Sequence, residues 1–334
     1  MTKKDLGLLI LIIVVGAIVA SVNPRFLRIE NLANTANTIG MFGISALGQS
    51  VVILTAGIEL SVGSVIALTG VLFVDLISNH GVPWPIALGI VLVLGALIGL
   101  FHGLLITRLK MQPFIVTLCG LLFYRGIARF YTGDSTAGFG FGQSFPELEF
   151  IAAGRSFGVP NTFIAMVIIA VIMWVVLHRS IYGRYLYAVG KNEEAARYSG
   201  IKTGLIIVSA YVLCQLLTVV SSVYFAMYTR SIAPSAHGNF YELYAIAAAV
   251  LGGFSLRGGE GSIVGVILGV VLLQELQNLV IFLNIPSSLN YAIMGGVILL
   301  GVLADQQFNA YRNRRRIVEA ARAPATGDKP EGTR

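Results

Sequence analysis

The sequence predicts an all-α polytopic membrane protein of about ten transmembrane helices, packed as a tight, glycine-rich bundle. Of the 334 residues, 56% are hydrophobic and only 12% are charged, and the mean hydropathy is +0.82. A soluble domain carries roughly 25% charged residues. Apolar runs long enough to cross a bilayer, about 20 residues each, recur along the chain. We therefore expect lipid to cover much of the surface.

Ten segments qualify as spans, and the eighth is short and glycine-rich, so we expect it to be broken or re-entrant. The predicted spans are 6–22, 38–57, 61–78, 85–107, 113–132, 161–178, 204–228, 243–256, 262–283 and 289–304. The first follows Lys3 and Lys4 and resembles the core of a signal peptide. No small-residue cleavage site follows it, so it is interpreted as a retained span.

The distribution of basic residues predicts that both termini are cytoplasmic. With ten spans in that orientation, the cytoplasmic segments hold seventeen of the 23 Lys and Arg residues, and the outer segments hold four. This asymmetry follows the positive-inside rule. The arginines at 312 and 314–316 indicate a basic tail beside membrane lipid rather than a nucleic-acid site. We expect residues 1–304 to form the transmembrane domain and the polar tail, 305–334, to be disordered.

Small residues recur at helical spacing in two segments. Gly95, Gly99 and Gly103 form one strip, and a second comprises Gly261, Gly265 and Gly269. Such strips let helix backbones approach closely. Two hairpins, 56–64 and 252–262, also resemble each other, since each ends in Gly-Ser and opens an apolar helix. Glycine-interrupted repeats point to the binding region in transporters, and we place both hairpins near the cytoplasmic face.

The loop of about 179–203 is predicted to contain a short cytoplasmic helix. Asn192 suits the N-cap, and Gly200 suits the stop. Ala195 and Ala196 would leave one small-residue surface free for docking. An ordinary amphipathic helix at the membrane interface is an equally good interpretation of this segment alone.

Four motifs, taken in order, resemble the ribose-type (monosaccharide) ABC transporter permease family, within the branched-chain amino acid/ribose superfamily of bacterial inner-membrane permeases. They are Glu59-Leu60-Ser61-Val62-Gly63-Ser64, Pro113–Leu118 followed by Arg125-Gly126, the loop with Gly190, Asn192, Ala195, Ala196, Gly200 and Ile201, and the second Gly-Gly hairpin. The resemblance covers about residues 38–304. Two positions depart from the family pattern, which usually has Asp at 59 and commonly Asn at 102, where this chain has Glu59 and His102.

The resemblance implies a multi-pass permease of the bacterial plasma (inner) membrane, in an importer for a simple sugar such as a pentose or 6-deoxyhexose. Its partners would be ABC ATPase subunits, a periplasmic or extracytoplasmic sugar-binding protein and a second permease, identical or paralogous. ATP would bind the partner, so no cofactor is expected in this chain; Gly190-Lys191 lacks the remainder of a P-loop. The residues implied in ATPase coupling are Gly183, Gly190, Asn192, Ala195, Ala196 and Gly200.

Polar residues within the spans are candidates for the substrate pathway. The ninth span carries Gln274, Glu275, Gln277 and Asn278, and such groups should face the bundle interior. Polar packing between helices explains them equally well. The other candidates are Glu59, Ser61, Ser64 and Arg125. Arg125 and Glu275 lie at equal predicted depth with opposite charge, so one hypothesis is that they pair, with Arg129 as the alternative partner. The other interpretations are that each faces a wet cavity separately, or that the Arg125 side chain extends toward the outer surface.

Enzyme chemistry finds little support in the sequence. The four histidines lack metal-ligand spacing, and His102 is interpreted as a hydrogen-bonded packing residue. An ion-coupled secondary transporter is the main alternative; the coupling loop, and the lack of a carboxylate or histidine chain for a proton relay, argue against it. The sequence leaves the sugar undetermined.

Overall fold

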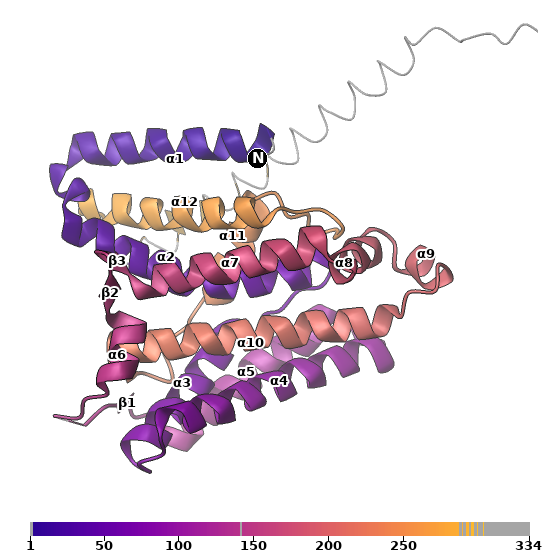
Figure 1. Cartoon of the computed structure of the whole chain (residues 1–334), viewed down its shortest axis with the longest axis horizontal. Helices are drawn as coiled ribbons and strands as arrows, with labels where there is room; N and C mark the ends of the chain where they lie inside the picture. The colour runs from indigo at the N-terminus through magenta and orange to yellow at the C-terminus, as the bar shows by residue number, and fades with distance from the viewer. Residues whose placement is uncertain are drawn as a thin grey trace, which may run out of the picture. The chain divides into compact units, whose positions relative to one another are not determined.

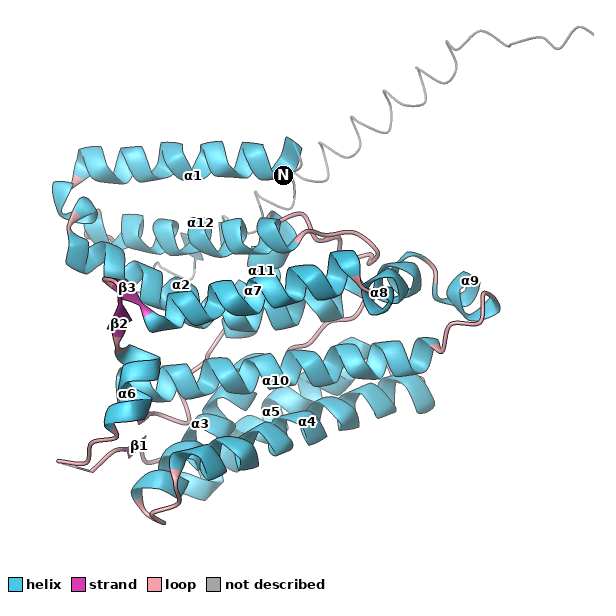
Figure 2. Ribbon diagram, viewed as in Figure 1, coloured by secondary structure: helices cyan, strands magenta, loops and turns pink. Residues whose placement is uncertain are grey.

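The computed structural model describes residues 3–140 and 142–286, with a few isolated positions between 289 and 303. In chain order, the first half contains α1 (Lys3–Val22), the 3-10 helix η1 (Pro24–Leu27), α2 (Ile29–Leu54), α3 (Val62–Ser78), α4 (Trp84–Arg108), α5 (Pro113–Thr132), β1 (Ala137–Gly138), α6 (Pro146–Ala153), β2 (Arg155–Ser156) and β3 (Val159–Pro160). The second half contains α7 (Asn161–Arg179), α8 (Ile181–Lys191), α9 (Glu193–Tyr198), α10 (Thr203–Thr229), β4 (Ser231–Ile232), α11 (Tyr241–Leu251) and α12 (Ile263–Phe282). Figures 1 and 2 show that helices dominate the part of the chain that is described.

Every predicted span up to residue 283 overlaps one of these helices. Seven of the described helices are long and apolar enough to cross a membrane, whereas α3 and α11 are shorter apolar helices. The eighth predicted span is therefore confirmed as short. The tenth predicted span and the tail lie outside the described residues, apart from the isolated positions, so the total of about ten is not established here.

The second helix begins nine residues earlier than the predicted span. Hydropathy alone does not detect this first part, because residues 29–38 are largely polar. Its polar groups are satisfied locally: Asn31 donates to the Phe26 carbonyl at 2.8 Å, and Thr35 donates to the Asn31 carbonyl at 2.8 Å. The helix thus extends beyond the apolar run that defined the prediction.

The connections gather at two opposite ends of the long helices (Figure 1). One end, named the α6 end, carries α6 and the two small sheets, in which β1 pairs with β4 and β2 pairs with β3, both antiparallel. The other end, named the α8–α9 end, carries those two helices and the α4–α5 turn. These two names are used below.

The predicted glycine strips make close helix contacts, except that Gly261 precedes α12 and meets the Phe254 ring instead. A Cβ atom at Gly99 would lie 2.6 Å from the Tyr211 carbonyl oxygen of α10, and one at Gly103 would lie 2.7 Å from the Val208 Cα. Gly265 and Gly269 meet the backbone of α11 in the same way. Because no Cβ fits, α4 packs directly on α10 and α12 directly on α11.

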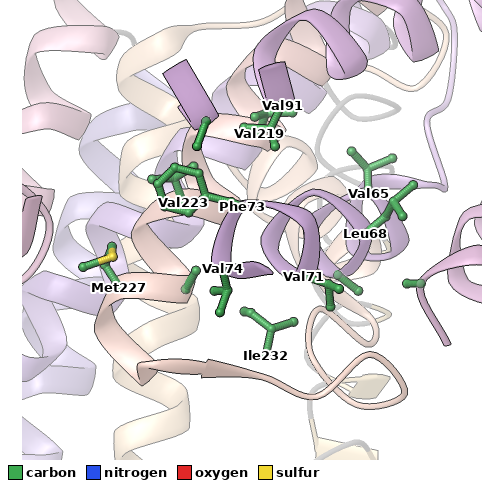
Figure 3. Packing of buried hydrophobic residues seen from close by; sticks show 14 of the residues in the cluster. Val65, Leu68, Val71, Phe73, Val74, Val91, Val219, Val223, Met227 and Ile232 are labelled. Carbon is green, nitrogen blue, oxygen red and sulfur yellow. The ribbon is translucent and has the colours of Figure 1, made fainter. Parts of the chain in front are cut away.

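A hydrophobic core joins α3, α4, α10 and β4 (Figure 3). Phe73 and Val219 are fully buried, and Ile232 of β4 closes one side of the cluster. This core buries most of α3, which is 17 residues long.

Candidate functional site: a transport path between interrupted helices

Two of the apolar helices, α3 and α11, are short, and the start of α3 is buried within the bundle. At 1.5 Å per residue, α3 and α11 span about 26 and 17 Å, less than the roughly 30 Å of a hydrocarbon core. Their first turns meet, because a Cβ at Gly63 would lie 1.9 Å from the Gly238 carbonyl oxygen and 2.6 Å from Glu242 Oε2. The Glu242 side chain is only 7% exposed. A carboxylate there is well placed, since the N-terminus of a helix favours negative charge.

Arg125 holds the segment that leads into α11. One guanidinium nitrogen donates to the Pro234 carbonyl at 2.9 Å and to the His237 carbonyl at 2.6 Å. The guanidinium also attracts the Glu242 carboxylate electrostatically. Residues 233–240 are thereby held against α5, so Arg125 supports the segment that leads into α11.

The predicted pairing of Arg125 with Glu275 is wrong in this structure. The Glu275 carboxylate faces α1 instead, with Oε1 3.5 Å from the place that a Cβ at Gly16 would occupy. Its Oε2 is buried and makes no hydrogen bond to a described residue. The alternative partner, Arg129, pairs with Asp134 at 2.6 Å near the α6 end. Equal depth along two helices did not place their side chains on facing surfaces.

Glu59 lies in the break between α2 and α3 and is completely buried. Its Oε1 accepts hydrogen bonds from the Ser61 N–H at 2.8 Å and the Ser61 hydroxyl at 2.7 Å. Its Oε2 lies 2.8 Å from His102 Nδ1 of α4. The other ring nitrogen of His102 lies 3.0 Å from the Tyr124 hydroxyl of α5. The break is thus fastened to two further helices by a continuous polar chain.

Two glutamines complete this buried network. With its amide nitrogen toward the Glu59 carbonyl, Gln49 donates at 3.1 Å and accepts from the Glu59 N–H at 3.3 Å. Gln215 donates to the Ser61 hydroxyl at 3.1 Å, and the Ser64 hydroxyl donates to the Ser61 carbonyl at 2.8 Å. The interpretation of His102 as a hydrogen-bonded residue is confirmed. The sequence analysis missed Gln49 and Gln215, whose only signal was an amide within an apolar run.

The predicted short helix in the 179–203 loop is present as α9. The Asn192 side chain caps it by accepting from the Ala195 N–H at 2.9 Å, and Gly200 beyond it has a φ of +84°. The preceding residues, expected to be loop, form α8. One correction concerns Ala196, which is buried in a hydrophobic cluster with Val189 and Ile207 and so does not belong to the exposed surface. Ala195 is exposed.

Three backbone segments converge beside α8. A Cβ at Gly190 would lie 1.8 Å from the Leu54 carbonyl oxygen and 2.5 Å from the Gly259 nitrogen. The Gly259 N–H itself donates to the Leu54 carbonyl at 2.9 Å. This contact, named the Gly190 junction, brings together the end of α2, the end of α8 and the loop before α12. Gly183 has a separate role, because a Cβ there would meet the Leu177 carbonyl oxygen where α7 turns into α8.

A pocket opens between α2, α11 and α12. It is named the α2–α11–α12 pocket, and its lining residues are Phe42, Ala46, Tyr244, Ala245, Ala248, Val270, Leu273, Gln274 and Gln277. Asn278 lies on the same helix and donates to the Thr35 hydroxyl of α2 at 2.7 Å. Of the candidate pathway residues, Gln274 and Gln277 line this pocket. Glu59, Ser61 and Ser64 lie within the buried network.

Metal binding has no candidate in the described part of the chain, since no three His, Cys, Asp or Glu side chains there are grouped to hold an ion. The buried network and the pocket instead offer hydrogen-bonding groups and aromatic rings. Polar groups arranged around interrupted helices are typical of the substrate region of transporters.

Comparison with known proteins agrees with this class. Residues 31–302 match the family model described as the branched-chain amino acid transport system / permease component. The ribose import permease protein of Escherichia coli K12 is 39% identical over 299 residues, covering 90% of this chain and 92% of that protein. The ribose import permease protein of Bacillus subtilis strain 168 is 40% identical, with 91% and 92% covered.

A more distant relative is the autoinducer 2 import system permease protein of Escherichia coli O9:H4, which is 31% identical over 94% of this chain and 91% of its own. No solved structure matches the chain. The fold and the matches together define a multi-pass membrane permease. The chain belongs to the branched-chain amino acid transport system permease family, and ribose import permeases are among its relatives.

Proposed function

We propose that this chain is the permease subunit of an ATP-driven importer for a simple sugar such as a pentose or 6-deoxyhexose. The observation that carries the proposal is the Gly190 junction. Through it, the helix pair α8–α9 touches the backbone at two places: Leu54, at the break between α2 and α3, and Gly259, in the loop between α11 and α12. A partner that moves α8–α9 would therefore move the α2–α3 break and the α11–α12 loop together.

The surface of α9 suits a protein partner. Glu194 and Ala195 are exposed, and Tyr198 is 91% exposed. The Glu193 carboxylate is held by Arg197 at 2.7 Å within the helix. This rigid surface would dock in a separate ATPase, and the residues that fix its shape are Gly183, Gly190, Asn192, Ala195, Ala196 and Gly200. Of these, Ala196 would act from within, by anchoring α9 to the bundle.

The orientation that fits this role puts the α8–α9 end and both termini in the cytoplasm. The α6 end would then face outward and receive the sugar-binding protein, while a second permease, identical or paralogous, completes the path. Cysteine labelling of intact cells tests this orientation. We expect an impermeant reagent to reach a probe near residue 145 but not one near 193 or 320. Labelling at 193 from outside would overturn the orientation.

Reconstitution tests the function itself. We expect uptake of a pentose or 6-deoxyhexose into proteoliposomes only when the chain is combined with its ATPase and binding protein, and only with ATP. Uptake by the chain alone, driven by an ion gradient, would instead identify an ion-coupled secondary transporter. The relatives named for ribose import support the first result.

A further inference from the structure

We propose that the α2–α11–α12 pocket is a contact site for an uncharged sugar on the translocation path. The proposal deepens the proposed function, because it assigns to that path a place and a ligand chemistry. It rests on three observations: an amide that makes no hydrogen bond within the described part of the chain, the character of the lining, and the position of the pocket beside the short helix α11.

The amide belongs to Gln274 of α12. Its side chain lines the pocket and is only 6% exposed, yet it makes no hydrogen bond to any described residue. Its amide atoms are not among the fully buried atoms that lack a partner, so they are open toward the pocket. By contrast, the neighbouring amide of Asn278 is paired with Thr35. Gln274 therefore retains donors and an acceptor directed at whatever enters the pocket.

The lining selects the chemical class of the ligand. Phe42 and Tyr244 place two aromatic rings edge to face, with centroids 6.3 Å apart, and Gln277 adds a second amide. Aromatic rings pack against the C–H faces of a sugar, and planar amides pair with its hydroxyls. None of the lining side chains in the described part of the chain carries a charge. A phosphate or carboxylate would find no counter-charge there, so the fitting ligand is a neutral polyhydroxylated molecule.

The position of the pocket suits a transport path. Gln274 lies eleven residues into α12, about 17 Å along the helix axis, near half the thickness of a bilayer. The pocket includes Tyr244 of the short helix α11, and transporter substrates bind near the midplane beside such interrupted helices. Leu243, next to Tyr244, is 45% exposed, and Gln277 is half-buried, so the region is reachable. The pocket is small, so it would hold one hydroxyl-bearing edge of a sugar rather than a whole ring. Such weak binding is consistent with passage.

Cysteine protection tests the contact without the other subunits. The full chain carries Cys119→Ser, which removes the exposed native thiol, and either Gln277→Cys in the pocket or Leu243→Cys beside it. In nanodiscs, we expect ribose or fucose at tens of millimolar to slow maleimide labelling at 277 at least threefold, with no effect at 243. Glucuronate at the same concentration should protect neither. Adding Gln274→Leu should abolish the protection at 277. Equal labelling with and without neutral sugar, or equal protection by glucuronate, would overturn the proposal.

Transport provides the second arm. In proteoliposomes with the ATPase and binding protein, we expect Gln274→Leu to lower sugar uptake about five- to tenfold, as the loss of one hydrogen bond predicts. The matched control is Gln112→Leu, an exposed glutamine whose side chain makes no capping bond; its uptake should equal wild type. Equal uptake by the two variants would overturn the site. Failure of the wild-type chain to take up any sugar would overturn the proposed function instead, and the labelling result would still decide the pocket.

Discussion

The contact between Glu59 and His102 makes a sharp stability prediction. Replacing His102 by Leu leaves Glu59 Oε2 buried without its partner, since Glu59 is 0% and His102 is 1% exposed. Removing the partner of a buried carboxylate costs several kcal/mol, about 3–5 kcal/mol where a buried pair is broken from one side. The same substitution also removes the acceptor or donor that faces the Tyr124 hydroxyl. We therefore expect His102→Leu to destabilise the bundle by about 4 kcal/mol.

The chain contains a matched control for this experiment. His80 Nε2 lies 3.3 Å from Asp75 Oδ2, with the histidine 63% exposed. Exposed ion pairs contribute roughly 0–1 kcal/mol, so His80→Leu should change stability by less than about 1 kcal/mol. The two variants remove the same side chain from the same kind of partner and differ in burial. Their comparison isolates the cost of the stranded carboxylate.

Unfolding in detergent mixtures, followed by circular dichroism, measures both variants. A double-mutant cycle adds Glu59→Gln, which removes the charge but keeps the shape. We expect the double variant to be more stable than the sum of the two single losses predicts, by about 2 kcal/mol, because contacting residues couple on this scale. Strictly additive losses, or an equal cost for the substitutions at 102 and 80, would refute the assignment of Glu59 and His102 as a buried pair.

Three further outcomes are expected. Gly190→Ala would place a methyl group against the Leu54 carbonyl and Gly259. We expect the permease to fold and the ATPase to co-purify, but ATP-driven uptake to fall at least tenfold. Normal uptake would contradict the role of the Gly190 junction. Ala195→Arg should weaken ATPase co-purification without lowering folded yield, whereas Ala196→Arg, at a buried position, should lower the yield itself, as gel filtration will report. At the α6 end, the hydrogen bond from Arg230 lowers the pKa of Glu149, so this contact stabilises the segment at neutral pH and is lost as pH falls through that lowered pKa. Glu149→Gln should then remove the acid dependence of proteolysis within 142–153, and an unchanged pH profile would count against the contact.

The sequence alone determined the class of the protein and most of its helices. Apolar runs of about 20 residues fix where helices cross lipid, because a bilayer leaves the backbone no other way to satisfy its hydrogen bonds. The sequence also predicted the close packing at the glycine strips, since a spacing of four residues places glycines on one helix face. The short helix α9 could also be predicted from the sequence, because its N-cap at Asn192 and its end beside Gly200 are local signals.

Tertiary structure alone decided which polar groups meet. Depth along a helix can be counted from the sequence, but the direction of a side chain around the helix depends on which neighbour packs against it. That is why Glu275 faces Gly16 rather than Arg125, and why Glu59 meets His102 across 43 residues of sequence. It is also why α3 and α11 begin beside each other: their first turns are in contact, a long-range arrangement that no single segment encodes. Local chemistry thus specified the elements, and packing between distant segments specified the site.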